Sequence, residues 1–155
     1  MYWSADREFL SSTTAANKGG KSLLKAFTEN IGACIDNCLS RLENGFEIKA
    51  FLWHQGESDK DAVAIYRENI KCVVQFVREY LVRKTSNWKY EELPFICGTF
   101  SLKSRDYNQQ IVDALYDLEL EDANFHVVNI SDGNLQPDQL HFDAKRGKIV
   151  GQTDV

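Results

Sequence analysis

The chain has 155 residues, of which 43% are hydrophobic and 26% charged, and this composition excludes a mainly disordered chain, a collagen-like repeat and a small disulfide scaffold. Its length predicts one domain that can bury a core of its own. Lysine and arginine number 18 against 23 aspartates and glutamates, giving a formal net charge of −5, so the chain lacks the basic surplus typical of nucleic-acid binding.

Neither membrane insertion nor metal binding is indicated by the sequence. No apolar run is long enough to span a bilayer, and residues 1–8 lack the basic and apolar segments of a signal peptide. The cysteines form no C-x-x-C pair and no zinc-ligand spacing, so we expect free thiols buried as small hydrophobic groups, which favours a reducing, cytoplasmic compartment. They are Cys34, Cys38, Cys72 and Cys97.

The first half of the chain begins with polar, irregular sequence. We expect residues 1–19 to form a loop. An amphipathic helix over residues 22–42 follows, because apolar residues recur there every three or four positions. Asn44-Gly45 ends this helix, since glycine is the usual residue just past a helix terminus. Residues 46–53 are mostly apolar and rich in strand formers, and they predict a strand.

The rest of the chain alternates between helix and strand. We expect a helix capped by Asp59 and Asp61, because acidic side chains stabilise helix N-termini. Strands that alternate with helices indicate an α/β fold with a parallel sheet and helices on both faces, although three strands are few for such a sheet. The predicted elements are a helix from 59 to a break at 85–87, a strand at 95–100, a helix at 107–118, a strand at 125–130 and a helix at 143–150.

Two of the loops that follow predicted strands carry groups suited to chemistry. In an open parallel sheet the ligand site lies beyond the carboxyl ends of the strands. His141 is matched to proton transfer near neutral pH, and Asp138 three residues earlier can hold its Nδ1–H and leave Nε2 to serve a nucleophile. On its own this spacing is also compatible with an ordinary surface turn. The segment Trp53-His-Gln-Gly-Glu-Ser-Asp59 combines a glycine with amide, carboxylate and imidazole groups, and it also suits a plain strand-to-helix connection.

These two segments resemble blocks of the SGNH hydrolases. Trp53-His-Gln-Gly-Glu-Ser-Asp59 is similar to the third block of the carbohydrate acetylesterases that include sialate O-acetylesterase and family 6 acetylxylan esterases. Asp138-Gln-Leu-His141-Phe142 is similar to their final Asp-x-x-His block. The similarity covers roughly residues 22–152. It implies an α/β/α sandwich with a flavodoxin-like parallel sheet.

The resemblance also implies an activity and a set of roles. Such enzymes remove acetyl groups from sugar hydroxyls through a serine acyl-enzyme, without a metal or cofactor. Carried over by position, His141 is the general base and acid and Asp138 orients it. Gln55 and Gly56 contribute to the oxyanion hole or bind the acetyl carbonyl. Glu57 is either a support for the histidine, a rival to Asp138 for the third triad role, or a structural residue.

The expected nucleophile block is not found. Related enzymes begin with a strand and a Gly-x-Ser block, followed by a block with an oxyanion-hole glycine. We therefore expect a chain that lacks these blocks and the first two strands of the sheet. Ser58, Ser101 and Ser131 are better explained as capping or loop residues than as substitutes.

The sequence thus predicts a carbohydrate O-acetylesterase domain that acts on acetylated xylan, sialic acid or another acetylated sugar. The alternative is a noncatalytic remnant of the fold that binds carbohydrate or assembles with a chain that supplies the nucleophile. An exposed sheet edge would suit such an assembly, because its unpaired backbone groups can accept another strand. No nucleic-acid or membrane partner is expected.

Overall fold

The structure is a computed structural model that describes Trp3 and residues 22–143. The predicted loop at 1–19, except Trp3, and the predicted helix beyond residue 143 lie outside this part. The chain divides into two compact units. Met1–Lys49 and Glu68–Leu93 form the first, and Ala50–Arg67 with Pro94–Val155 form the second.

The first unit is helical. Helix α2 (Leu23–Asn37) begins at Ser22, whose hydroxyl accepts a hydrogen bond from the Lys25 amide at 3.2 Å, an ordinary N-cap contact. A short 3₁₀ turn, η2 (Leu39–Arg41), follows it. Helix α3 (Val63–Thr85) begins in the second unit and runs on in the first, and η4 (Trp88–Glu92) follows.

Helices α2 and α3 are joined by side chains of the first unit. The Tyr80 hydroxyl donates to the Thr28 carbonyl oxygen at 2.6 Å, and Lys84 Nζ lies 2.6 Å from Asp36 Oδ2. Gly32 lies directly against the Tyr80 hydroxyl, where any side chain would collide with it. The absence of a side chain at Gly32 therefore allows the two helices to approach closely at this point.

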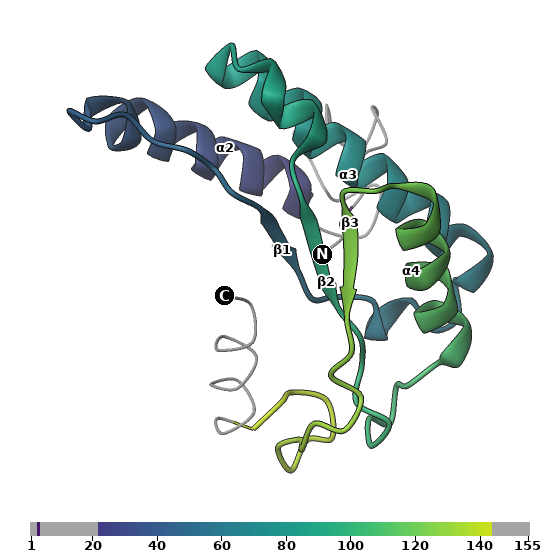
Figure 1. Ribbon diagram of the computed structural model, residues 1–155. Helices are drawn as coiled ribbons and strands as arrows, with labels where there is room; N and C mark the ends of the chain where they lie inside the picture. The colour runs from purple at the N-terminus through teal and green to yellow at the C-terminus, as the bar shows by residue number, and fades with distance from the viewer. Residues whose placement is uncertain (1–2, 4–21, 144–155) are drawn as a thin grey trace. The chain divides into compact units, whose positions relative to one another are not determined.

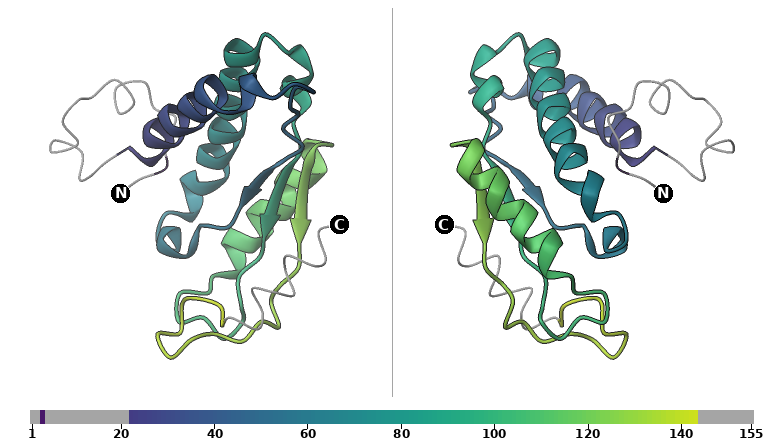
Figure 2. Two further views of the ribbon diagram at one scale, coloured as in Figure 1. Left: turned by 90° about the vertical axis from the view of Figure 1, so that its left-hand side faces the viewer. Right: turned by 90° about the vertical axis from the view of Figure 1, so that its right-hand side faces the viewer.

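The second unit contains a parallel sheet with the order β1-β2-β3. Its strands are β1 (Phe51–Trp53), β2 (Phe95–Gly98) and β3 (Phe125–Val128). Helix α4 (Gln109–Glu121) crosses between β2 and β3 and lies alongside β3, as Figure 1 and Figure 2 show. The predicted α/β class with parallel strands is confirmed.

A row of phenylalanines in register holds this sheet together. Phe51, Phe95 and Phe125 are opposite one another on the three strands. The ring centroids are 4.8 Å apart between Phe51 and Phe95 and 5.4 Å apart between Phe95 and Phe125, and both pairs are stacked. Because Phe95 and Phe125 are each 1% exposed, this row forms the centre of the core of the second unit.

The structure corrects the bounds of the predicted elements, most of all at two of their ends. Strand β1 begins at Phe51 rather than at residue 46, because the Ile48 amide bonds to the Tyr90 hydroxyl at 3.1 Å instead of joining a strand ladder. Helix α2 ends at Asn37 rather than at residue 42, since Cys38 leaves helical geometry with φ −123°.

The prediction of buried thiols is wrong for three of the four cysteines. Only Cys97 is buried, and Cys34, Cys38 and Cys72 are exposed, all as free thiols. On α2 the buried stripe runs through Leu24, Thr28 and Ile35, so Cys34 falls outside it although its neighbours are apolar.

We predict that the phenylalanine row dominates the stability of the second unit. Phe95→Ala should lower the free energy of unfolding by about 3–5 kcal/mol, because it removes a fully buried ring that stacks on two others. Leu120→Ala is the matched control, because Leu120 lies on α4 and is 87% exposed. It should change stability by less than about 0.5 kcal/mol in a denaturant titration. Equal losses for the two variants would contradict the assigned core.

Candidate functional site

The loops that follow β2 and β3 are joined at the carboxyl edge of the sheet. The Leu102 amide donates to the Ser131 carbonyl oxygen at 2.9 Å, and the Ser101 hydroxyl donates to the Gly133 carbonyl oxygen at 2.7 Å. The two loops run side by side beyond the strand ends in Figure 1 and Figure 2. The edge at which a parallel α/β sheet carries its ligand site is therefore built from polar loop residues.

Asp138 and His141 form a compact turn in the loop after β3. Asp138 Oδ1 accepts hydrogen bonds from the amides of Leu140 and His141 at 3.0 and 3.1 Å. Gln139 between them has the left-handed conformation, with φ 57°. Such side-chain-to-backbone bonds are typical of aspartate in turns. They fix the carboxyl group before any contact with the imidazole is considered.

The second carboxylate oxygen of Asp138 holds the imidazole of His141. His141 Nδ1 lies 2.7 Å from Asp138 Oδ2. Because a carboxylate only accepts hydrogen bonds, Nδ1 carries the proton, and Nε2, which makes no hydrogen bond within the described part, is the nitrogen that can act as a base. The hydrogen bond from His141, followed by those from the two amides, lowers the pKa of Asp138 to about 2.

The loop after β1 is ordered by buried groups of the second unit. The Tyr66 hydroxyl donates to the Gln55 carbonyl oxygen at 3.0 Å. Burial raises the pKa of Tyr66 well above its usual value, so this hydroxyl stays protonated and remains a donor. Gly56 has φ 146°, and an added Cβ would lie 2.6 Å from the Tyr66 hydroxyl oxygen and 2.8 Å from Phe100 Cζ. Only glycine fits at this position.

The predicted site residues of this loop, Gln55 and Glu57, have different surroundings. Gln55 Nε2 donates to Asp59 Oδ2 at 2.8 Å, so this amide contacts its own loop, and Asp59 accepts that bond instead of capping α3 as expected. Glu57 begins the short turn η3 (Glu57–Asp59) and lines a cavity together with His141. Asp138, not Glu57, makes the hydrogen bond to the imidazole.

This cavity is where the two sequence blocks meet. It has a volume of about 450 Å³, within the range of roughly 300–1,000 Å³ usual for small-molecule sites. Its lining comes from both blocks: His54, Glu57, Ser58, Leu140, His141 and Phe142. Gln55 and Gly56 are not among the lining residues.

His54 and Phe142 connect the two blocks, although the sequence predicts a role for neither. The two rings have centroids 5.3 Å apart, and the His54 ring also lies 6.1 Å from Phe100. His54 Nε2 is 3.3 Å from the Thr99 carbonyl oxygen. The position of His54 directly after a buried strand was the available signal. Its contact with Phe142, the residue after His141, could not be read from sequence because the two are far apart in the chain.

In the described part, no serine makes a hydrogen bond to His141. The Ser101 hydroxyl is buried and engaged with Gly133, so it ties loops together. Ser58 is exposed inside η3 and lines the cavity, but in residues 22–143 no hydrogen bond joins it to the imidazole. Ser131 lies in a separate pocket beside α4.

Other kinds of site receive no support from the described residues. Within this part, no three or more histidine, cysteine, aspartate or glutamate side chains are grouped so as to hold a metal ion. None of the helices that the structure describes is long and apolar enough to cross a membrane. Burial also raises the pKa of the Cys97 thiol well above its usual value, so this thiol remains protonated and unreactive.

Comparisons with known proteins identify the family. The family model described as "Carbohydrate esterase, sialic acid-specific acetylesterase" matches residues 13–153. The chain belongs to this carbohydrate esterase family. An X-ray structure of a protein from Arabidopsis thaliana is similar at 25% identity with a TM-score of 0.64, and the match covers 90% of this chain and 54% of that one. The chain thus spans about half the length of the plant protein. Curated proteins give no match.

The pKa of Asp138 provides a direct test of the turn. We predict a value of about 2 in the wild type, because the carboxylate is held by His141 and two amides. His141→Ala should move this pKa back toward the usual 3.8, since the side-chain hydrogen bond is its largest cause. The pKa is lowered on folding, so the turn's contribution to stability is present above pH 4 or so and is lost as the pH falls through about 2.

Carboxyl-carbon NMR during an acid titration measures this pKa in both proteins. His126→Ala is the control, because His126 is an exposed residue of β3 outside the turn. A normal pKa for Asp138 in the wild type would contradict the hydrogen bond to His141.

Proposed function

We propose that this carbohydrate esterase removes O-acetyl groups from sugars, with His141 as the group that moves the proton and Asp138 as its positioning residue. The observation that carries the proposal is the 2.7 Å contact between His141 Nδ1 and Asp138 Oδ2 at the wall of a cavity shared with Glu57. A carboxylate that fixes the tautomer of an imidazole at a ligand-sized cavity is the arrangement used for general base catalysis.

The reaction follows from the free Nε2 of His141. A serine hydroxyl gives its proton to Nε2 as its oxygen attacks the acetyl carbonyl carbon, and a tetrahedral oxyanion forms. The sugar oxygen leaves with the proton returned by Nε2, and the acetyl group stays on the serine. Water then repeats the two steps, releasing acetate and free serine. Asp138 stabilises the imidazolium formed in each half-reaction.

We further propose that the nucleophilic serine lies outside residues 22–143. Ser101 is committed to the Gly133 carbonyl oxygen, and Ser58 makes no hydrogen bond to His141. A serine is activated only when its hydroxyl is within hydrogen-bond reach of the base. For Gln55 we propose an indirect role in oxyanion binding, because its amide nitrogen is oriented by Asp59. Gly56 lets the backbone of this loop lie close to the Tyr66 and Phe100 side chains.

The proposal predicts that ester hydrolysis depends on His141. With 4-nitrophenyl acetate as the substrate, and in the protein that includes the nucleophilic serine, His141→Ala should lower the rate by about a hundredfold or more, the usual contribution of a positioned general base. Asp138→Asn should lower it as well, because the imidazole loses the acceptor that fixes its tautomer. Stopped-flow absorbance at saturating enzyme measures these rates.

His126→Ala is again the matched control, since it removes an exposed imidazole of the same unit. Its rate should equal that of the wild type. Equal rates for His141→Ala and His126→Ala would contradict the assigned role. Carbohydrate binding by a protein that includes the serine, with hydrolysis unaffected by His141→Ala, would instead support the noncatalytic alternative.

A further inference from the structure

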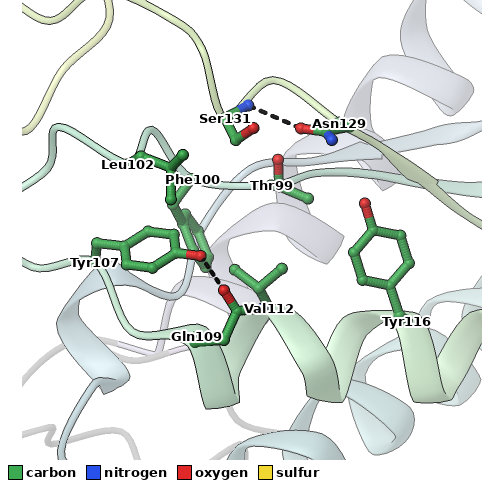
Figure 3. Close-up of a pocket in the computed structure, with 9 residues that line it drawn as sticks. All are labelled: Thr99, Phe100, Leu102, Tyr107, Gln109, Val112, Tyr116, Asn129 and Ser131. Atoms are coloured by element: carbon green, nitrogen blue, oxygen red, sulfur yellow. Dashed lines mark hydrogen bonds between the residues drawn. The ribbon is translucent and has the colours of Figure 1, made fainter.

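A second pocket lies beside α4, away from the residues assigned to ester chemistry. It has a volume of about 230 Å³, smaller than the roughly 300–1,000 Å³ that encloses drug-sized ligands, so it suits one small ring. Figure 3 shows Tyr107 and Tyr116 on opposite sides of Val112, with Asn129 and Ser131 facing them from the segment after β3. All of its lining residues belong to the second unit.

Phe100 places this pocket next to the His141 cavity. Its ring lines the pocket and also lies 6.1 Å from the ring of His54, which lines the cavity. Phe100 is 1% exposed, so its buried side chain lies between the pocket and the His141 cavity. A ligand in the pocket therefore lies near the His141 cavity without entering it.

The Tyr107 ring on the aromatic side of the pocket is held in place before any ligand binds. The Tyr107 hydroxyl donates to Gln109 Oε1, and Gln109 Nε2 donates to Asp113 Oδ1 at 2.8 Å. Both ends of the Gln109 amide are engaged, and they hold the Tyr107 ring in place. A rigid aromatic surface binds a ring with little loss of conformational entropy.

The opposite side of the pocket carries polar groups that can still form hydrogen bonds with a ligand. Asn129 Oδ1 accepts from the Ser131 amide at 3.0 Å, and within residues 22–143 neither N–H group of the Asn129 amide is hydrogen-bonded, so both can donate to a ligand. The hydroxyls of Tyr116 and Ser131 make no hydrogen bond to any other residue in the part that the structure describes. The Asn129 amide and the Ser131 hydroxyl face Val112 and the tyrosine rings. A pyranose offers hydroxyl groups to the former and apolar C–H groups to the latter.

The lining also selects for charge. Among the described residues, no lysine, arginine, aspartate or glutamate lines this pocket, so an ionised ligand would find no counter-charge there. An uncharged sugar needs none.

We propose that the pocket formed by Tyr107, Tyr116, Asn129 and Ser131 binds a neutral pyranose unit of a carbohydrate. The carbohydrate class rests on the proposed function, whereas the preference for a neutral ring comes from the pocket. The site is distinct from the cavity that holds His141, and its test needs no hydrolysis.

The test is titration of the isotope-labelled chain, observed by ¹H–¹⁵N NMR, with three separate probes. These are methyl β-xylopyranoside as the neutral sugar, N-acetylneuraminic acid as the anionic sugar, and cyclohexanol as an apolar ring of similar size. We expect the neutral sugar to shift the Asn129 side-chain amide and the backbone amides of residues 129–131, and to bind more tightly than the other two.

Variants separate specific binding from surface effects. Asn129→Ala and Tyr116→Phe should each weaken the binding of methyl β-xylopyranoside by about 3- to 10-fold, the usual effect of losing one hydrogen bond. Asn37→Ala is the matched control, because Asn37 is an exposed residue of the first unit. Its affinity should be that of the wild type, and unchanged spectra elsewhere show that each variant is folded.

Four results would overturn the proposal. They are equal binding of cyclohexanol, tighter binding of the anionic sugar, shifts confined to residues 54–58 and 141, and no binding of the neutral sugar. Loss of esterase activity in His141→Ala with unchanged sugar binding would leave the proposal standing, so the two hypotheses fail separately.

Discussion

Parallel pairing of three short strands is the constraint on which the second unit depends. Phe51, Phe95 and Phe125 are in register and stack in one row, so the strands end at the same edge. Any slip of one strand would separate these rings and shift its loop along the sheet. The phenylalanine row therefore determines where the polar loops lie, and with them the cavity lined by Glu57 and His141.

A second level of order fixes the loops themselves. Asp138 closes the turn around His141 through three hydrogen bonds, two to backbone amides and one to the imidazole. On the facing loop, the buried Tyr66 hydroxyl and the absence of a side chain at Gly56 set the backbone path. The rings of His54 and Phe142 join the two loops. These contacts fix the two loops in the geometry that the proposed acid–base role requires.

Much of this could be predicted from the sequence because the signals are local. Alternation of apolar segments predicts the parallel α/β class, and the spacing of Asp138 and His141 predicts their contact, since both depend on neighbouring residues. The start of β1 could not be predicted, because residues 46–50 have strand propensity but their hydrogen bonds go elsewhere, as at Ile48. Exposure of Cys34 depends on which side of α2 is covered, and apolar periodicity defines that side only approximately.

The same distinction explains what was missed at the site. The resemblance implies a role for Gln55 in oxyanion binding, but it does not indicate the hydrogen bond from the Gln55 amide to Asp59, four residues away in the same loop. The pocket beside α4 combines residues of the β2 loop, of α4 and of the β3 loop, so no single stretch of sequence indicates it. Contacts between distant segments are where sequence patterns carry the least information.

The central claim is that residues 22–143 supply the acid–base part of a serine esterase site and that the nucleophile lies outside them. Intact mass measurement after treatment with a fluorophosphonate serine probe, followed by peptide mapping, tests it most directly, because the probe reacts only with a serine activated by a nearby base. The account predicts that no serine between residues 22 and 143 is modified. A stoichiometric adduct on Ser58 or Ser101, lost in His141→Ala, would contradict it.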